Sequence, residues 1–453
     1  MCPGGGIGRH KGLKIPRRKL RAGSSPAPGT NNDSLLNFLG MSSYKEVKKI
    51  LLIPDSVWGN DSGHRSTQFL IKALKNSGYE LGVFAEDKGD FHLQKKELEK
   101  ELNVFFYKKV PYSFLDQFYI LNKKARREFD SVVKDFQPDL VFYFGTIRNK
   151  VSIDFISSKK NKIPYIYLPL TNEFWCLKNF AGLKSGECFK CMNHNFYHAW
   201  VQGCSEEKSF FWFIKESIER IYSKNRFLNA NSVLGYSESQ VETFIKFGLP
   251  KEKTATTNIF FERKDLEKFD PKKGDYFVIF GQMNIAKGWH YVPTIIKTMM
   301  QKNIKFKLII YNKSKAENFI KQNSLESFIE NGNLEIFSGL ESHEDVLQIV
   351  SQSLAVIIPS NYPSTGEFTL LESLGLKKPV LGFDVGAHKS FLKDRNNALI
   401  SNVTDLEKMK RDILELNQDT LLWEKISSNA YKTFERLTDF NKKEESLISN
   451  INL

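Results

Sequence analysis

Short apolar runs alternate with longer amphipathic stretches along most of the chain. In the first block of this alternation, the runs at 49–54, 81–85, 140–144 and 165–169 predict strands, and the stretches at 66–77 and 118–136 predict helices. Short strands separated by helix-length segments are typical of a parallel sheet that is covered by helices on both faces.

The same alternation restarts after about residue 270. Strands are predicted at 276–280, 307–311, 334–337, 355–359 and 379–383, and helices at 290–301, 315–324, 343–351, 369–376 and about 420–450. Two such blocks predict two doubly wound α/β domains with a cleft between them, where ligands bind at the carboxyl ends of the strands. We expect an N-terminal domain at 41–262 and a C-terminal domain at 263–453, joined by a charged segment at 261–273.

The first forty residues have a different character. They are rich in Gly, Pro and Arg and lack apolar periodicity, so we expect residues 1–40 to be disordered. The stretch at 8–30 reads like the translation of a transfer-RNA gene, which favours Met41 as the native start; the alternative is a genuine basic tail. Seven basic residues and one acidic residue lie in this segment, so it contributes +6 to the formal net charge of +14. The remaining formal charge of +8, carried by residues 41–453, fits a partner that carries phosphates. It does not by itself indicate nucleic acid.

The composition is that of a globular enzyme, with 41% hydrophobic and 26% charged residues. No apolar run reaches the roughly 18–20 residues of a membrane span, and no signal-peptide pattern is present. We therefore expect a cytoplasmic protein. The aromatic and basic segment at 208–227 is the candidate for peripheral contact with the inner face of a membrane or with a lipid-linked acceptor, although packing against the domain is the simpler interpretation.

Two segments of the C-terminal block carry candidate nucleotide-binding residues. The sequence GQMNIAKG (281–288) follows a predicted strand and precedes a helix, so Gly281 allows close approach of the backbone and Lys287 can place its ammonium on a phosphate. In the loop after the strand at 355–359, the backbone amides near Thr365 and Gly366 can receive an anion, and Glu372 can accept hydrogen bonds from a ribose. The simpler interpretation makes Lys287 and Glu372 solvated surface residues.

The order and spacing of these segments resemble the group 1 family of retaining glycosyltransferases, which have the GT-B fold of two Rossmann-like domains. The resemblance covers about residues 46–435 and is carried by Gly281, Lys287, Gly288, Pro359, Ser360, Glu372, Ser373, Leu374, Pro379 and Val380. It implies transfer of a sugar from a nucleotide-diphosphate sugar to a hydroxyl acceptor in cell-surface polysaccharide or glycolipid assembly. Lys287, Glu372 and Glu367 are the candidate catalytic residues, and a catalytic metal is not expected.

Several positions depart from the family pattern. The arginine of the family's first motif is Gln282 here, and the first of its paired acids falls at Ser364, with Glu367 three residues later. These changes indicate either a site remodelled around its donor or a non-catalytic relative that only binds nucleotide sugars.

The N-terminal block carries the expected acceptor side of the cleft. Gly63 lies in a loop before the first predicted helix, where His64, Arg65 or Ser66 can contact a phosphate or the acceptor. The simpler interpretation is a helix start with a solvated histidine. Asn172 stands where the family has a histidine; it can hydrogen-bond a sugar but cannot act as an acid or base.

Four of the five cysteines lie close together in the sequence. Cys176, Cys188, Cys191 and Cys204 have spacings that suit a tetrahedral, structural zinc site, with free or disulfide-linked thiols as the alternative. A nucleic-acid-binding zinc protein is a weaker alternative function, because no nucleic-acid-binding motif accompanies the cysteines.

Overall fold

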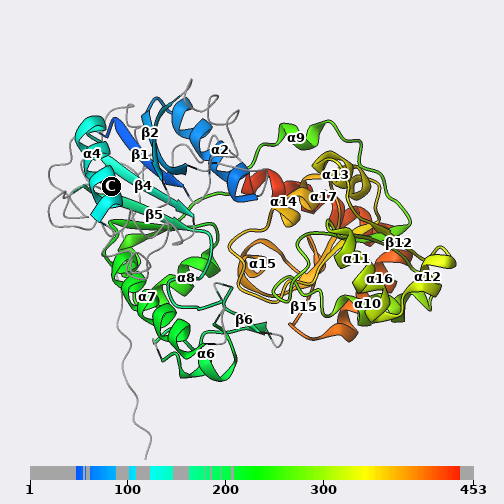
Figure 1. Ribbon diagram of the computed structural model, residues 1–453. Helices are drawn as coiled ribbons and strands as arrows, with labels where there is room; N and C mark the ends of the chain where they lie inside the picture. Colours follow the sequence, from blue (N-terminus) through cyan, green and yellow to red (C-terminus); the bar gives the residue numbers. More distant parts are fainter. Residues whose placement is uncertain are drawn as a thin grey trace, which may run out of the picture. The chain divides into compact units, whose positions relative to one another are not determined.

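The computed structural model describes residues 47–54, 57, 62–87, 102–108, 123–145, 163–178, 180–183, 186–193, 195–205 and 209–438. The expected tail at 1–40 and the proposed start at Met41 lie outside these residues, as do positions 118–122 and 439–450 of two predicted helices. The described chain has an α/β fold with two parallel sheets and flanking helices (Figure 1).

In the described residues, the first sheet has seven strands in the order β3-β2-β1-β4-β5-β8-β9, and neighbouring strands pair in parallel. The central run KILLIP of β1 is buried after its first residue, because strands covered on both faces need no polar alternation. The strands are β1 (Lys49–Pro54), β2 (Glu80–Asp87), β3 (Asn103–Lys108), β4 (Leu140–Gly145), β5 (Tyr165–Pro169), β8 (Ser232–Gly235) and β9 (Thr254–Thr256). Their helices are α2 (Ser62–Asn76), α4 (Lys123–Phe136), α6 (Tyr197–Val201), α7 (Phe210–Leu228) and α8 (Glu238–Lys246).

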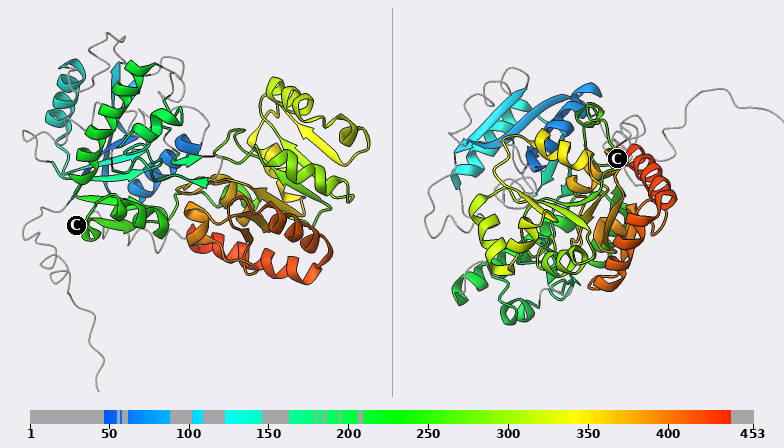
Figure 2. Two further views of the ribbon diagram at one scale, coloured as in Figure 1. Left: turned by 90° about the horizontal axis from the view of Figure 1, so that it is seen from below. Right: turned by 90° about the vertical axis from the view of Figure 1, so that its right-hand side faces the viewer.

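The second sheet lies in the continuously described range 209–438 and has six parallel strands in the order β12-β11-β10-β13-β14-β15. They are β10 (Tyr276–Ile279), β11 (Lys305–Ile309), β12 (Leu334–Phe337), β13 (Ala355–Ile358), β14 (Val380–Phe383) and β15 (Leu399–Ser401). The helices are α9 (Lys264–Glu267), α10 (Val292–Met300), α11 (Lys313–Asn323), α12 (Glu326–Glu330), α13 (His343–Ser351), α14 (Phe368–Gly375), α15 (Gly386–Phe391), α16 (Leu406–Gln418) and α17 (Thr420–Leu437). Figure 2 shows α16 and α17, in orange and red, beside this sheet.

The strand order of the second sheet reverses at β10, which pairs with β11 on one side and β13 on the other. The loops that follow β10 and β13 therefore leave the sheet next to each other at its carboxyl edge. Crevices at such a reversal are where open α/β sheets bind ligands. This reversal brings the segment 281–288 beside the segment 359–367.

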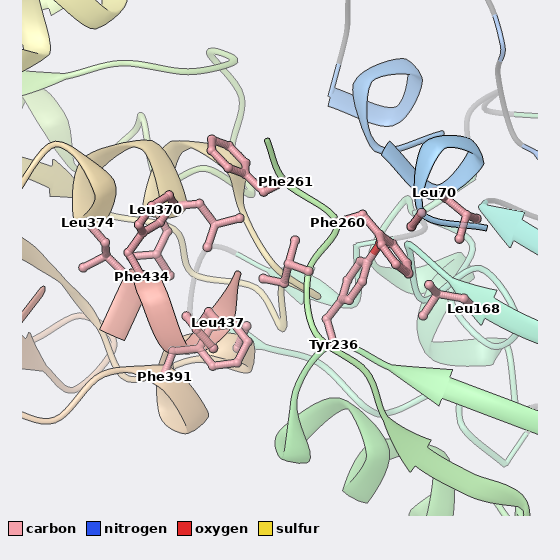
Figure 3. Packing of buried hydrophobic residues seen from close by; sticks show 14 of the residues in the cluster. Leu70, Leu168, Tyr236, Phe260, Phe261, Leu370, Leu374, Phe391, Phe434 and Leu437 are labelled. Atoms are coloured by element: carbon pink, nitrogen blue, oxygen red, sulfur yellow. The ribbon is translucent and has the colours of Figure 1, made fainter. Parts of the chain in front are cut away.

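The segment that joins the two sheets is part of the hydrophobic core. Ile259, Phe260 and Phe261 are at most 2% exposed, and the predicted charged link at 261–273 contains α9. One core cluster includes side chains from both sheets. Figure 3 shows members of this cluster around the joining segment, namely Leu70, Leu168, Tyr236, Phe260, Phe261, Leu370, Leu374, Phe391, Phe434 and Leu437. Within the described residues, none of the helices combines the length and apolar character that a membrane crossing requires.

Candidate functional site

Two loops of the second sheet approach each other because one position is glycine. Gly288 has a φ of +71°, and a Cβ atom built there would lie 1.8 Å from the carbonyl oxygen of Pro359. The backbone N–H of Asn361 also donates to the carbonyl of Ala286 at 3.0 Å. The loops after β10 and β13 are thus packed backbone to backbone, which fixes the position of Lys287 at the end of the first loop.

Lys287 forms a partly buried ion pair with Glu367, the residue that precedes α14. Lys287 Nζ donates to Glu367 Oε2 at 2.7 Å, and the Ser360 hydroxyl donates to the same oxygen at 3.1 Å. Burial by itself would lower the pKa of Lys287, but the negative charge of Glu367 outweighs it, so the lysine pKa lies above its usual range. Burial by itself would raise the pKa of Glu367, yet Lys287 holds it below the ordinary value. Both groups are therefore charged at neutral pH.

Glu372 is a buried acid within α14, with a side chain only 2% exposed. Its Oε1 accepts a hydrogen bond from Arg65 Nη2 at 3.1 Å and lies 2.7 Å from His343 Nε2. Arg65 comes from the first turn of α2 and His343 begins α13, so three helices meet at this carboxylate. The predicted ribose-binding acid is consequently a buried group and not a solvated surface residue.

The loop before α14 is held by the segment that follows β5. The Thr365 hydroxyl donates to the Leu170 carbonyl at 3.1 Å, and Asn172 Nδ2 donates to the Pro363 carbonyl at 3.2 Å. Asn172 is 3% exposed. Its amide nitrogen thus secures the loop, and its predicted contact with a sugar, like the predicted contact of Thr365 with the donor, stays a prediction.

The remaining predicted donor-site residues lie near these groups along the chain. Gly281 follows β10 with a φ of +112°, and Gln282 after it is exposed. Gly366 has a φ of +155° and directly precedes Glu367. Gly63 lies in the first turn of α2, two residues before Arg65, and its carbonyl accepts the Thr67 hydroxyl at 3.0 Å. The roles of these positions toward a donor stay predictions.

Three further residues complete the surroundings of the two acids and were not among the predicted site residues. His343 contacts Glu372, and the Tyr362 ring lies 5.2 Å from Lys287 Nζ. His388 is fully buried, with Nε2 3.9 Å from Glu367 Oε1 and Nδ1 3.0 Å from the Phe383 carbonyl. Their positions after β12, β13 and β14, at the same carboxyl edge, are the sequence signal that points to them.

The structure gives no support to the predicted zinc site. Cys176, Cys188, Cys191 and Cys204 line one small cavity and are free thiols. Among the residues that the structure describes, however, no group of three or more His, Cys, Asp or Glu side chains has an arrangement that can hold a metal. Burial and the neighbouring cysteines raise the pKa of the Cys191 thiol to about 12.

Comparison with known proteins gives a family match for the second sheet and its helices. Residues 261–433 match the family model described as "Glycosyl transferases group 1". This range contains Lys287, Glu367 and Glu372. No curated protein matches the full sequence significantly.

Solved structures match over nearly the whole chain. Anabaena Alr3699/HepE in complex with UDP and glucose has a TM-score of 0.61 and 16% identity, covering 89% of this chain and 99% of that chain. A glycosyltransferase from Rickettsia africae has a TM-score of 0.62 and 16% identity, covering 89% and 97%. A mutant of S. aureus TarM in complex with fondaparinux, alpha-GlcNAc-glycerol and UDP has a TM-score of 0.63 and 12% identity, covering 90% and 100%. The chain therefore has the GT-B fold, and its residues 261–433 match the group 1 glycosyl transferases.

Proposed function

We propose that this protein transfers a sugar from a nucleotide-diphosphate sugar to a hydroxyl group of a glycan or lipid-linked acceptor. The observation that carries this proposal is that Lys287, Glu367 and Glu372 lie at the carboxyl edge of the second sheet, within the range that matches the glycosyltransferase family. The UDP-glucose complex of the Anabaena protein supports a nucleotide sugar as the donor class.

The two buried acids have different roles in this proposal. Glu372 accepts hydrogen bonds from the ribose hydroxyls, because a buried carboxylate is a strong acceptor for a diol. Lys287 binds the diphosphate, and Glu367 keeps that lysine charged and directed into the site. The backbone amides at the start of α14 add partial positive charge on the same side.

The proposed reaction proceeds with retention of the anomeric configuration. The bond between the anomeric carbon and the diphosphate oxygen breaks, and its electron pair stays on the diphosphate. The acceptor hydroxyl attacks the same face of the sugar, a new carbon–oxygen bond forms, and the hydroxyl proton passes to the departing diphosphate. Both buried acids are occupied by cationic or imidazole partners, which favours this route over one with a carboxylate nucleophile.

Assembly of a surface polysaccharide or glycolipid at the inner face of a membrane is the proposed setting. Exposed apolar side chains on α6 and α7 support contact with a membrane surface, namely Tyr197, Trp200, Val201, Phe210, Phe211, Ile214, Ile218 and Ile221. The acceptor itself is proposed only as a glycan or lipid-linked hydroxyl compound.

The alternative function is a relative that binds nucleotide sugars without transferring them. Gln282 and Ser364 favour it, because each is neutral where the family pattern has a charged side chain. Catalysis separates the two functions, since a binding protein does not release nucleoside diphosphate from its ligand.

A donor screen followed by a turnover assay tests the proposal. Thermal unfolding with UDP-, GDP- and ADP-sugars identifies the donor, because a ligand that binds the folded protein raises its stability. Release of nucleoside diphosphate is then measured for the wild type, for Lys287→Ala and for Lys305→Ala, whose lysine is exposed and paired with Asp275. We expect loss of turnover in Lys287→Ala and normal turnover in Lys305→Ala. A wild-type protein that binds a sugar nucleotide and never releases diphosphate with any acceptor would establish the alternative.

A further inference from the structure

Arg65 reaches from α2 to the buried acid of the donor half. Its Nη2 donates to Glu372 Oε1 at 3.1 Å, and its guanidinium carbon lies 4.9 Å from the centre of the Phe368 ring. The Arg65 side chain is 26% exposed and the Glu372 side chain 2%. The guanidinium is therefore stacked on one residue of α14 and hydrogen-bonded to another, at the entrance to the proposed ribose site.

Within the residues that the structure describes, most of the hydrogen-bonding capacity of this guanidinium is unused. Arginine has five N–H donors. Among the described residues, Nη2 of Arg65 donates to Glu372, and Nε is buried without an acceptor. A planar guanidinium with unused donors matches the geometry of a phosphate group. A bound ligand with phosphate oxygens would satisfy the buried Nε as well.

The charge balance of the site requires a second cation for a diphosphate. Lys287, Glu367 and Glu372 together carry a formal charge of −1, counted as one cation and two carboxylates. A site with that balance would repel a diphosphate. Arg65 brings the sum to zero, whereas Gln282, the exposed residue beside Gly281, contributes no charge.

The two ion pairs lie at a spacing that suits one extended ligand. Glu367 precedes α14 and Glu372 lies five residues further along it. The four residues from Phe368 to Glu372 rise about 6 Å along the helix, so Lys287 is anchored just before α14 and Arg65 at its second turn. A nucleotide whose ribose hydroxyls bind Glu372 would place its diphosphate within reach of both cations.

We propose that Arg65 is a diphosphate-binding residue of the donor site, supplied by the first sheet's half of the protein. This inference rests on the proposed function and names a residue that determines donor affinity. In the structure, Arg65 is paired with Glu372. When the donor binds, ribose hydroxyls take over Glu372 and the guanidinium turns its free N–H groups to the phosphate oxygens.

The inference is tested by measuring the binding of UDP and of uridine to the same variants. If the donor screen selects another base, the nucleoside diphosphate and nucleoside of that base are used instead. Arg65→Ala should weaken UDP binding by about 1.4 kcal/mol or more, a tenfold change in Kd, and leave uridine binding within about twofold. Arg65→Lys keeps the positive charge but lacks the planar guanidinium, so its affinity for UDP should lie between those of the wild type and Arg65→Ala. Gln282→Arg introduced into the Arg65→Ala protein should restore much of the UDP affinity, because it supplies a cation from the other loop.

A lysine further along α2 provides the matched control. Lys72 forms an exposed pair with Glu262, so Lys72→Ala should change neither affinity. Equal weakening of UDP and uridine by Arg65→Ala would overturn the inference, since it would show that Arg65 only positions Glu372. Unchanged UDP binding in Arg65→Ala would overturn it as well. A wild-type protein that binds neither UDP nor any other nucleotide would instead refute the proposed function, and the inference with it.

Discussion

Lys287 and Glu367 form an ion pair in which Nζ lies 2.7 Å from Oε2, and the Glu367 side chain is 2% exposed. The two residues are 80 positions apart in the sequence, and the reversal of strand order at β10 brings their loops together. The pair serves two purposes in the proposed function. It keeps the lysine charged for the diphosphate, and it stabilises a carboxylate that is buried away from water.

Substitution of Lys287 is expected to affect both turnover and stability. Loss of a preorganised cation at the leaving group should cost about 2.7–4 kcal/mol of activation free energy, a rate loss of about 10²–10³ in kcat. Lys287→Met should also leave Glu367 buried without its partner and lower the free energy of unfolding by about 3–5 kcal/mol. Product formation and urea unfolding measure the two effects.

The double variant Lys287→Met with Glu367→Gln separates these effects. Removing both charges should recover most of the lost stability, because no unpaired carboxylate remains buried. Turnover should stay low, because the cation is still absent. Recovery of turnover together with stability would contradict a catalytic role for Lys287.

Gly288 offers a test of the contact between the two loops of the proposed donor site. In Gly288→Ala the new Cβ would meet the Pro359 carbonyl at 1.8 Å, so one loop must move. We expect a loss of folding stability larger than the roughly 1 kcal/mol that alanine costs at a positive φ, together with loss of the donor-induced thermal shift. Gly248→Ala is the control, since Gly248 has a φ of +109° and open space around it. Equal effects of the two substitutions on stability and donor binding would argue against this contact.

The sequence predicted the fold better than it predicted the partners within the site. Central strands such as β1 and β5 were predicted at their observed bounds, because buried parallel strands read as continuous apolar runs. The strands β3, β8, β9 and β15 were not predicted. β9 and β15 are only three residues long, and β3, β9 and β15 lie at sheet edges. Short strands and edge strands give a weaker run of apolar residues in the sequence than central strands do.

Long-range pairing explains what was missed in the site. Lys287, Glu367 and Glu372 were each predicted as site residues, but local patterns do not tell which side chains meet. Arg65 and Glu372 are 307 positions apart, and only the fold brings these two side chains into contact. The cysteines show the opposite case. Their spacing predicted a tetrahedral zinc site. The four cysteines do line one cavity, but among the described residues no group of side chains has the arrangement that a metal requires.

Lys378 should make folding stability depend on pH. It is fully buried, and its Nζ donates to the carbonyls of Lys272 and Ser353 at 2.6 and 2.9 Å. Burial lowers its pKa to about 7, below the value of about 10.4 expected in the unfolded chain. Between these values the unfolded state binds more protons, so the contribution of Lys378 to stability rises as the pH increases from about 7 to about 10.

Urea unfolding at pH 7, 8 and 9 measures this dependence. The Lys378→Met variant should show a smaller increase in the free energy of unfolding over this range than the wild type, because the titrating group is gone. The comparison isolates Lys378 from tyrosines and other groups that titrate at high pH. Identical slopes in the two proteins would show that Lys378 keeps an ordinary pKa when folded.

The exposed face of α7 should bind lipid vesicles. Phe213, Ser217 and Arg220 are buried at helical spacing, whereas Ile214 and Ile218 on the adjoining face are 40% and 37% exposed. A helix that is apolar beyond its packed face has surface available to contact a membrane, where a lipid-linked acceptor, one of the two proposed acceptor classes, would lie.

Cosedimentation with vesicles of mixed neutral and anionic lipid tests this face. The wild type should bind. Joint replacement of the exposed isoleucines by Ser, namely Ile214→Ser, Ile218→Ser and Ile221→Ser, should reduce binding, because each removes apolar area that would enter the interface. Leu421→Ser is the matched control, since Leu421 is 78% exposed on α17 and lies outside this face. Turnover on a water-soluble acceptor should persist in all these variants. Vesicle binding that is equal in the triple variant and the wild type would show that α7 is not the membrane-contacting surface.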